Sequence, residues 1–178
     1  MQEESVILID DHDHEIGMLE KMEAHRLGLL HRAFSILIFN HKGELLLQQR
    51  AAHKYHSPLL WTNTCCSHQR PGESSLEAAN RRLKEEMGME ATLQEAFCFI
   101  YKAKLDQGLT EHELDHVLIG YSNQNPVINK EEVEDYKWIS MNELLNDLDQ
   151  FPQTYTAWFK ILLNQHLEEI TKAAYESL

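Results

Sequence analysis

The chain has 178 residues, of which 43% are hydrophobic and 25% charged, so it is long enough for one substantial core, and we expect a single domain over residues 1–178. Sixteen lysines and arginines stand against 29 aspartates and glutamates, which gives a formal net charge of −13. A field of that sign repels nucleic acid and anionic lipid, and we expect neither as a partner.

The first predicted elements are strands. Residues 5–9 are predicted to form a short edge strand that ends in an acidic stretch. Residues 33–39 and 44–50 flank the turn-forming sequence Asn-His-Lys-Gly at 40–43, which predicts a β-hairpin. The following segment, WTNTCCSHQRPGE, is polar and has no sustained period, so we expect it to be irregular.

A helix is predicted to begin near Ser74. Ser74 and Glu77 form a capping-box pattern, and Gly88 suits the left-handed position just past the helix end. Spacings of three and four predict a core-facing stripe of Leu76, Ala79, Leu83 and Met87. The opposite face, taken alone, predicts solvated ion pairs among Arg81, Arg82, Glu85 and Glu86.

The remaining elements complete the fold prediction. Residues 97–105 and 111–122 alternate with a period of two around a loop at 106–110, which predicts a second hairpin. Residues 141–149 predict a short helix, and an amphipathic helix closes the chain, with an apolar face of Leu163, Leu167, Ile170 and Ala174. Strands and helices in this order favour an α/β or α+β fold, with helices on the faces of a mixed sheet.

Glu111 and Glu113 lie two apart on a predicted strand, so both carboxylates project from one face and can converge on a cation. Alone, the pair fits an exposed charged strand face better than a metal site. His25, His31 and His68 lie where loops and strand ends can bring them to the pair, and such a set favours Mn²⁺, Zn²⁺ or Mg²⁺. The other histidines considered are expected to be ordinary surface or core residues: His12, His14, His41, His53, His56 and His166.

Four basic residues fall near predicted strand ends or on the polar helix face: Lys21, Arg50, Lys54 and Arg82. In an acidic protein, a local group of cations suits an anionic ligand. A small diphosphate is a fitting ligand, because arginine binds phosphate with two hydrogen bonds and lysine adds a positive charge on a flexible side chain. Taken singly, each of these residues fits a solvated surface charge better than a ligand contact.

Cysteine usage points to a reducing compartment. Cys65, Cys66 and Cys98 are odd in number, include an adjacent pair and lack the spacing of a disulfide framework. The first residues carry acids rather than a basic segment, and the longest apolar-rich stretch, AFSILIF, is too short for a bilayer. We expect a cytoplasmic protein that is a monomer or a weak homodimer.

Two stretches, WTNTCCSH and RPGESSLEAANRRLKEEMG, resemble type I isopentenyl diphosphate isomerase, a branch of the Nudix superfamily. The Nudix box, G-x5-E-x7-R-E-U-x-E-E-x-G-U, aligns with Glu73, Arg81, Leu83, Glu85, Glu86, Gly88 and Met89. The chain departs from the box at Ser67, which replaces its first glycine, and at Arg82, which replaces a glutamate that hydrolases use for attack by water. The second departure favours the isomerase.

The likeness extends from Lys21 to about Trp158 through the segments LEKMEAH, TEHELDHVL and AWF. It implies a Nudix-like mixed β-sheet sandwiched between α-helices. It also implies the interconversion of isopentenyl and dimethylallyl diphosphate in isoprenoid biosynthesis, through a tertiary carbocation in a closed apolar cavity. The register of the family's TNxxCxH pattern selects Cys66 as the functional cysteine and leaves Cys65 as a packing residue.

The resemblance also implies residue roles. Cys66 and Glu113 would exchange protons with opposite faces of the alkene, Tyr101 would hydrogen-bond the carboxyl group, and Trp158 would stabilise the cation, although without the family Trp158 fits simple packing. A divalent metal, Mn²⁺, Zn²⁺ or Mg²⁺, would bind His25, His31, His68, Glu111 and Glu113. Mg²⁺ would accompany the diphosphate, held by Glu86 and the Cys66 carbonyl, with the diphosphate bound by Lys21, Arg50, Lys54, Ser67 and Arg82.

Two other functions remain open at this stage. A Nudix hydrolase would keep Glu85 and Glu86, as this chain does, and would release phosphate from a diphosphate substrate with Mg²⁺. A non-catalytic protein could bind a diphosphate or a metal with a degraded Nudix box, and Cys66 and Glu113 would then be incidental.

Overall fold

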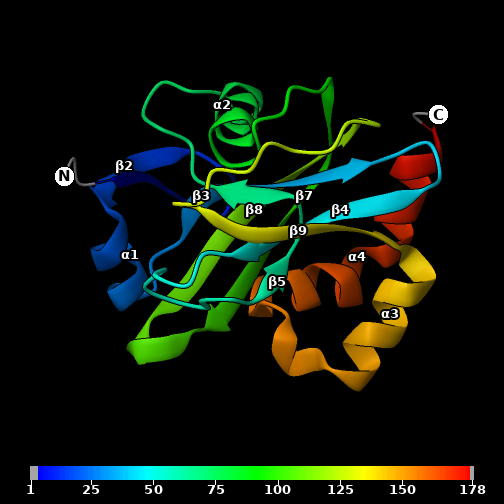
Figure 1. Cartoon of the computed structure of the whole chain (residues 1–178). Coiled ribbons are helices and arrows are strands. Elements are labelled where there is room, and N and C mark those ends of the chain that lie inside the picture. Colours follow the sequence, from blue (N-terminus) through cyan, green and yellow to red (C-terminus); the bar gives the residue numbers. More distant parts are fainter. Residues whose placement is uncertain (1–3, 177–178) are drawn as a thin grey trace.

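A mixed sheet of nine strands, flanked by helices on both faces, is the frame of residues 4–176, which the computed structural model describes (Figure 1). The strands are β1 (Ser5–Ile9), β2 (Glu15–Glu20), β3 (His31–Phe39), β4 (Glu44–Arg50), β5 (Trp61–Thr62), β6 (Cys65–Ser67), β7 (Leu93–Lys104), β8 (Thr110–Tyr121) and β9 (Val133–Ser140). The helices are α1 (Lys21–Leu27), α2 (Ser75–Met87), α3 (Met141–Gln150) and α4 (Ala157–Glu176). The predicted mixed sheet between helices is confirmed.

The central strands are buried on both faces because successive side chains enter different cores. On β3, Phe34 and Ile36 pack in a cluster with Leu83 of α2, whereas Leu37 packs in a second cluster with Phe159 of α4. In Figure 1, α2 lies on one side of the sheet and α3 and α4 lie on the other. Burial of apolar surface on both faces, at roughly 25 cal/mol per Å², is the main stabilising contribution to this arrangement.

Helix α2 has the predicted ends. The Ser74 hydroxyl accepts a hydrogen bond from the Glu77 backbone N–H, and the Glu77 carboxylate accepts one from the Ser74 backbone N–H. Gly88 ends the helix at φ 60°. Two predictions on this helix were wrong. Leu76 is 46% exposed instead of facing the core, and the ion pair of Arg82 with Glu86 is largely buried instead of solvated. The buried face is rotated toward Ala78 and Glu86, which leaves Leu76 at its margin.

The prediction that residues 5–9 form an edge strand was also wrong. Strand β1 pairs antiparallel with β2 and contacts β3 through the pair Leu8 and His31, so β2 is the edge. Strand β2 was not predicted, because it is largely exposed and its sequence shows no clear alternation of apolar and polar residues. Ile16 and Met18 both face solvent. The short elements α1, β5 and β6 and the strand β9 were not predicted either.

The first predicted hairpin is present only at its turn. Strands β3 and β4 pair at Phe39 and Leu45 and then separate. Beyond that point β3 pairs in parallel with β8, and β4 pairs antiparallel with β9. The second predicted hairpin is confirmed, because β7 and β8 pair antiparallel along nearly their whole length.

The chain from β5 to β6 crosses the gap between β3 and β4. Thr64, fully buried, donates from its hydroxyl to the Leu46 carbonyl at 2.6 Å and accepts from the Ile38 N–H at 2.9 Å. The Asn63 amide donates to the carbonyls of Ile36, at 3.2 Å, and Cys65, at 2.8 Å. Side chains thus satisfy backbone groups that the separating strands leave without a ladder partner.

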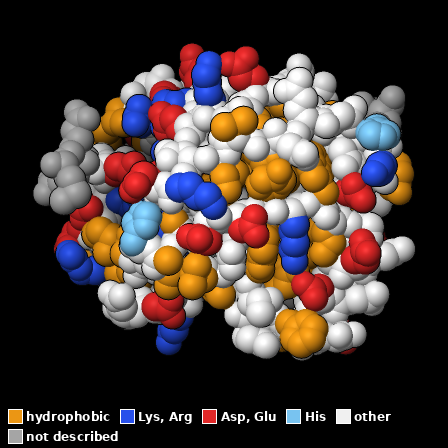
Figure 2. Space-filling view, viewed as in Figure 1, with side chains coloured by type: hydrophobic (Ala, Val, Ile, Leu, Met, Phe, Trp, Pro, Cys, Tyr) orange, Lys and Arg blue, Asp and Glu red, His pale blue; other side chains and the backbone are white. Residues whose placement is uncertain are grey.

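The surface carries charges of both signs. In Figure 2, acidic and basic side chains are interspersed over the face that is drawn, with hydrophobic areas between them. No helix within residues 4–176 is long and apolar enough to cross a membrane.

The two leucines of α2 allow a test of this packing. Replacing Leu83, which has no exposed surface, with Ala is expected to lower the free energy of unfolding by about 2–5 kcal/mol, because it leaves a cavity in the core. The matched change Leu76→Ala, in the exposed first turn, is expected to cost less than about 1 kcal/mol. Urea unfolding of both variants measures the difference, and equal losses would contradict the helix orientation.

Candidate active site

A cavity of about 100 Å³ lies where the separated strands meet the β5–β6 segment. Every residue predicted for catalysis or for diphosphate binding lines it: Lys21, Arg50, Lys54, Cys66, Ser67, Arg82, Tyr101, Glu113 and Trp158. It shares Glu4, Lys21, Ser67 and His68 with a larger neighbouring cavity of about 500 Å³. The expected closed apolar cavity is only partly present, since charged and polar residues make up most of the lining.

Three neighbouring strands place a row of site residues side by side. His31 on β3 is the register partner of Glu113 on β8, and Glu113 is the register partner of Tyr101 on β7. Opposite residues in a ladder project to the same face of the sheet, so the three side chains meet. Glu111 lies on that face too, two residues before Glu113, and all four side chains are buried.

One carboxylate oxygen, Oε1 of Glu113, is the meeting point of three imidazoles. The Nε2 atoms of His68, His31 and His25 lie 3.0, 3.2 and 3.6 Å from it. One ligand atom from each of these four residues lies within 4.8 Å of the others, which makes the group a candidate metal site. Glu111, the fifth predicted ligand, does not belong to this close group.

The histidines fit a metal ion by their own contacts. Nδ1 of His31 donates to the Leu29 carbonyl at 2.8 Å, which leaves Nε2 as the atom available to a metal. His25, on α1, is buried, and neither of its ring nitrogens has a hydrogen-bond partner among residues 4–176. Burial lowers the pKa of His68 to about 4, so this imidazole is neutral, the form that binds metals. Three nitrogen ligands and one oxygen ligand suit Zn²⁺ or Mn²⁺.

The Tyr101 hydroxyl contacts both glutamates. It lies 2.7 Å from Oε2 of Glu113 and 2.9 Å from Oε2 of Glu111. Burial, with the charge of Glu113, raises the pKa of Glu111 well above its ordinary value, whereas the three imidazoles hold the pKa of Glu113 well below its own despite burial. Of the two carboxyl groups, Glu111 is therefore the one that holds a proton more readily.

Cys66 enters the cavity from β6, where it pairs with Ser35 of β3. Burial raises the pKa of its thiol well above the ordinary value, and Arg50 only partly opposes this effect. Cys66 is therefore a protonated thiol at neutral pH. The adjacent Cys65 is fully buried in the cluster beneath α2, as expected of a packing residue.

Trp158, at the start of α4, forms an aromatic wall of the cavity. The Arg50 guanidinium lies 5.2 Å from the centroid of its ring, and the centroid of the His56 ring lies 5.6 Å from it. His56 was expected to be an ordinary histidine, yet it lines the cavity, and burial together with Arg50 lowers its pKa to about 3. It is a neutral residue that packs against the site.

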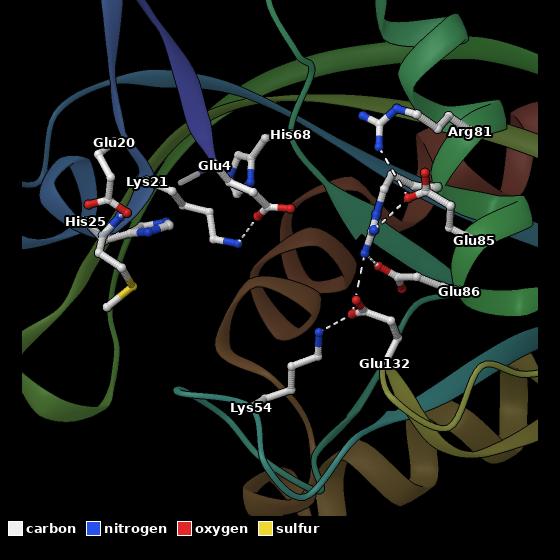
Figure 3. Close-up of polar contacts among 12 residues, drawn as sticks. Glu4, Glu20, Lys21, His25, Lys54, His68, Arg81, Glu85, Glu86 and Glu132 are labelled. Atoms are coloured by element: carbon white, nitrogen blue, oxygen red, sulfur yellow. Dashed lines mark hydrogen bonds and ion pairs between the residues drawn. The ribbon is translucent and has the colours of Figure 1, made fainter. Parts of the chain in front are cut away.

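The cations of the site are already paired, mostly with carboxylates. Lys21 donates to Glu4 at 2.6 Å, and Lys54 forms an ion pair with Glu132 (Figure 3). The Arg82 guanidinium contacts three carboxylates at once, those of Glu85, Glu86 and Glu132. Arg50 differs, because it donates to the backbone carbonyls of Ser57 and His56.

Sequence reasoning missed several residues of the cavity. Glu4, Ser35, Tyr55, His56 and Glu132 line it although none was proposed as part of the site. Glu4 and Glu132 come from segments far from the Nudix box, and no spacing in the sequence connects them to the cations that they contact. One signal could have predicted such residues. A group of cations in an acidic chain is expected to lie near carboxylates that balance its charge.

Comparison with known proteins identifies the family. A model of the NUDIX domain matches residues 29–159, which places the chain in the Nudix family. A curated relative from Aromatoleum aromaticum, named isopentenyl-diphosphate Delta-isomerase 2, is 50% identical over 163 residues, covering 92% of this chain and 86% of the relative. A relative of the same name from Photorhabdus laumondii is 49% identical over 171 residues, covering 94% and 97%. The chain therefore belongs to the isopentenyl-diphosphate Delta-isomerase family.

Solved structures support the fold. DR0079 from Deinococcus radiodurans matches with a TM-score of 0.70 at 19% identity, covering 83% of this chain and 90% of that one. The MutT protein from Methanosarcina mazei Go1 matches with a TM-score of 0.65 at 22% identity, covering 79% and 94%. At these identities the likeness concerns the fold alone.

The histidine cluster yields a test by metal content. Because His31 is one of four converging ligands, His31→Ala is expected to weaken binding of Mn²⁺ or Zn²⁺ by at least about tenfold. The matched control is His41→Ala, an exposed histidine outside the cluster, and it should bind metal as the parent protein does. Elemental analysis after equilibrium dialysis measures both, and undiminished metal in the His31 variant would refute the assignment.

Proposed function

We propose that this chain is an enzyme that interconverts isopentenyl diphosphate and dimethylallyl diphosphate by moving a double bond along a five-carbon chain. The observation that carries the proposal is that Cys66 and Glu113 line one cavity together with the cations Lys21, Arg50 and Lys54. Relatives about 50% identical to the chain bear the name of this isomerase. The reaction needs a proton donor, a proton acceptor and a diphosphate anchor, and the cavity offers each.

The proton count of the site suits the reaction. One proton must be added to the alkene and another removed from a neighbouring carbon, so a pair that carries one proton in total is required. The raised pKa of Cys66 keeps the thiol protonated, and the lowered pKa of Glu113 keeps the carboxylate ionised. The two groups come from β6 and β8, which both pair with β3, so the proton donor and the proton acceptor reach the cavity from different strands. The reaction is reversible, so the roles exchange with its direction.

Tyr101 orients the carboxylate. Its hydroxyl contacts Oε2 of Glu113, while the imidazoles surround Oε1, so both oxygens of Glu113 are held in place. The same hydroxyl also lies 2.9 Å from Oε2 of Glu111. A carboxylate whose direction is fixed before substrate binds needs little reorganisation during proton transfer.

Trp158 is proposed to stabilise positive charge on the substrate. Protonation of the alkene produces a tertiary carbocation, and an aromatic face stabilises a desolvated cation by about 2 kcal/mol. The cavity is partly open, and its lining is largely polar. Water must be excluded from the carbocation, and we infer that the diphosphate itself helps to fill the cavity when the substrate is bound.

Divalent metals would serve two places. His25, His31, His68 and Glu113, with Glu111 nearby, would hold Mn²⁺, Zn²⁺ or Mg²⁺, which when bound supplies positive charge that adjusts the acidity of its ligands. Glu86 and the Cys66 carbonyl would hold Mg²⁺ beside the diphosphate. The diphosphate would be bound by Lys21, Arg50, Lys54, Ser67 and Arg82.

The cellular setting is proposed from the sequence. We propose that the protein works in the cytoplasm as a monomer or weak homodimer, on a small allylic or homoallylic diphosphate, without nucleic acid or membrane partners. The net charge of −13 and the three unpaired cysteines support this setting.

A diphosphate hydrolase is the second candidate. Glu85 and Glu86 of the Nudix box are retained on α2, and the fold is that of the MutT protein. Arg82 contacts both carboxylates, however, and stands where the box has a further glutamate. Release of phosphate from a nucleoside diphosphate with Mg²⁺ would favour the hydrolase, and binding without turnover of any substrate would favour a non-catalytic protein.

The acid–base pair is tested by activity. Isopentenyl diphosphate with Mg²⁺ is expected to yield dimethylallyl diphosphate, and Cys66→Ala and Glu113→Gln are each expected to lower kcat by about 10²–10⁴-fold or more. The matched control Cys65→Ala, at the neighbouring packing position, should keep most of the activity. Circular dichroism checks that the variants fold, and unchanged rates in both site variants would exclude the pair.

Trp158 is tested by two substitutions of different character. Trp158→Leu removes the aromatic face and is expected to lower kcat about 30-fold, equivalent to about 2 kcal/mol. Trp158→Phe keeps an aromatic face and should retain more activity. A purely structural role would instead lower the free energy of unfolding of Trp158→Leu without a selective loss of kcat, which urea unfolding distinguishes.

A further inference from the structure

Glu132 forms ion pairs with two of the cations that would bind a diphosphate. Its Oε2 atom pairs with Nζ of Lys54 and lies 3.4 Å from Nη2 of Arg82. All three residues line the cavity. In Figure 3, the side chains of Lys54 and Glu132 point toward one another below Glu85 and Glu86, which α2 carries. One carboxylate oxygen between a lysine and an arginine is the arrangement that a phosphate oxygen would take.

The backbone of Glu132 is fixed. Its N–H donates to the Asn129 carbonyl at 2.9 Å, and its carbonyl accepts from the Ala51 N–H at 3.1 Å. These bonds tie the turn before β9 to the chain just after β4, a few residues before Lys54. The fold therefore places the carboxylate beside the cations, and the side chain of Glu132 is about a quarter exposed to solvent.

The charges around the proposed diphosphate site leave little positive charge uncompensated. Four cations line the cavity, and three of them are paired with carboxylates: Lys21 with Glu4, Lys54 with Glu132, and Arg82 with Glu86 and Glu132. A diphosphate ester brings about three negative charges to groups that already have counter-charges. Repulsion between it and Glu132 opposes binding, and a divalent cation carried with the diphosphate relieves most of that repulsion.

We propose that Glu132 is a specificity-determining residue that competes with the diphosphate for Lys54 and Arg82, so that the site disfavours the bare anion and accepts its complex with a divalent cation. This inference rests on the proposed function, because it takes the diphosphate as the ligand of these cations. When the complex binds, Lys54 passes from the carboxylate to a phosphate oxygen. Glu132 also draws Lys54 back as the product leaves, which limits product retention.

The experiment uses inorganic diphosphate as the probe and isothermal titration calorimetry as the measurement. Chelator-treated protein is titrated with diphosphate alone and with diphosphate plus excess Mg²⁺. Glu132→Gln removes the charge and keeps the size and an oxygen for Lys54. We expect this variant to bind metal-free diphosphate at least about fivefold more tightly than the parent protein, with a smaller gain for the magnesium complex.

The matched control is Glu131→Gln, the neighbouring exposed glutamate, which makes the same change in net charge outside the cavity. It should change either affinity by less than about twofold. Equal or weaker binding of metal-free diphosphate by Glu132→Gln would overturn the proposal and make Glu132 a residue that positions Lys54. A gain in Glu131→Gln equal to that in Glu132→Gln would overturn it too, as would the absence of diphosphate binding in both Glu132→Gln and the parent.

A separate assay keeps this test distinct from that of the proposed function. Failure of the parent protein to convert isopentenyl diphosphate would refute the isomerase activity, while the comparison of diphosphate affinities would still decide the role of Glu132. Thermal unfolding of the two variants, measured without ligand, verifies that the affinities belong to folded protein.

Discussion

The buried hydrogen bonds of Thr64 and Asn63 are the constraint on which the site depends. Strands β3 and β4 separate after one pair of residues, and a sheet cannot leave backbone donors and acceptors buried without partners. The two side chains supply those partners on both sides of the gap. The segment that carries Asn63 and Thr64 continues directly into β6. The hydrogen bonds that fix this segment therefore also place Cys66 and Ser67 at the cavity.

Strand β8, which lines the cavity through Glu111 and Glu113, concentrates buried acids, and their burial is costly for stability. Glu111, Glu113 and Asp115 alternate along one face of β8, and burial raises the pKa of Asp115 well above its ordinary value. Ser35 donates to Asp115 at 2.7 Å, and imidazoles surround Glu113, so most of these acids have partners. Buried groups of this kind persist where function requires them, at the expense of the free energy of folding.

The sequence predicted those parts of the molecule whose residues follow a strong local rule. The caps of α2 and the shared face of Glu111 and Glu113 depend on spacing within one element, and the hairpin of β7 and β8 depends on two consecutive elements. The structure has all three. The pairing of β3 with β8, the inner position of β1 and the contact of Glu132 with Lys54 depend on distant segments. No local period encodes such contacts. The resemblance to a family, and not periodicity, predicted that the scattered site residues belong to one site.

Arg82 fixes the charge balance on one face of α2. Where the Nudix box has a glutamate, this arginine contacts the carboxylates of Glu85, Glu86 and Glu132. A glutamate at this position would bring four carboxylates together, with Arg81, which contacts Glu85, as the arginine left beside them, and mutual repulsion would destabilise the helix face. The consensus acid would therefore need a divalent cation or a second substitution to offset the added negative charge.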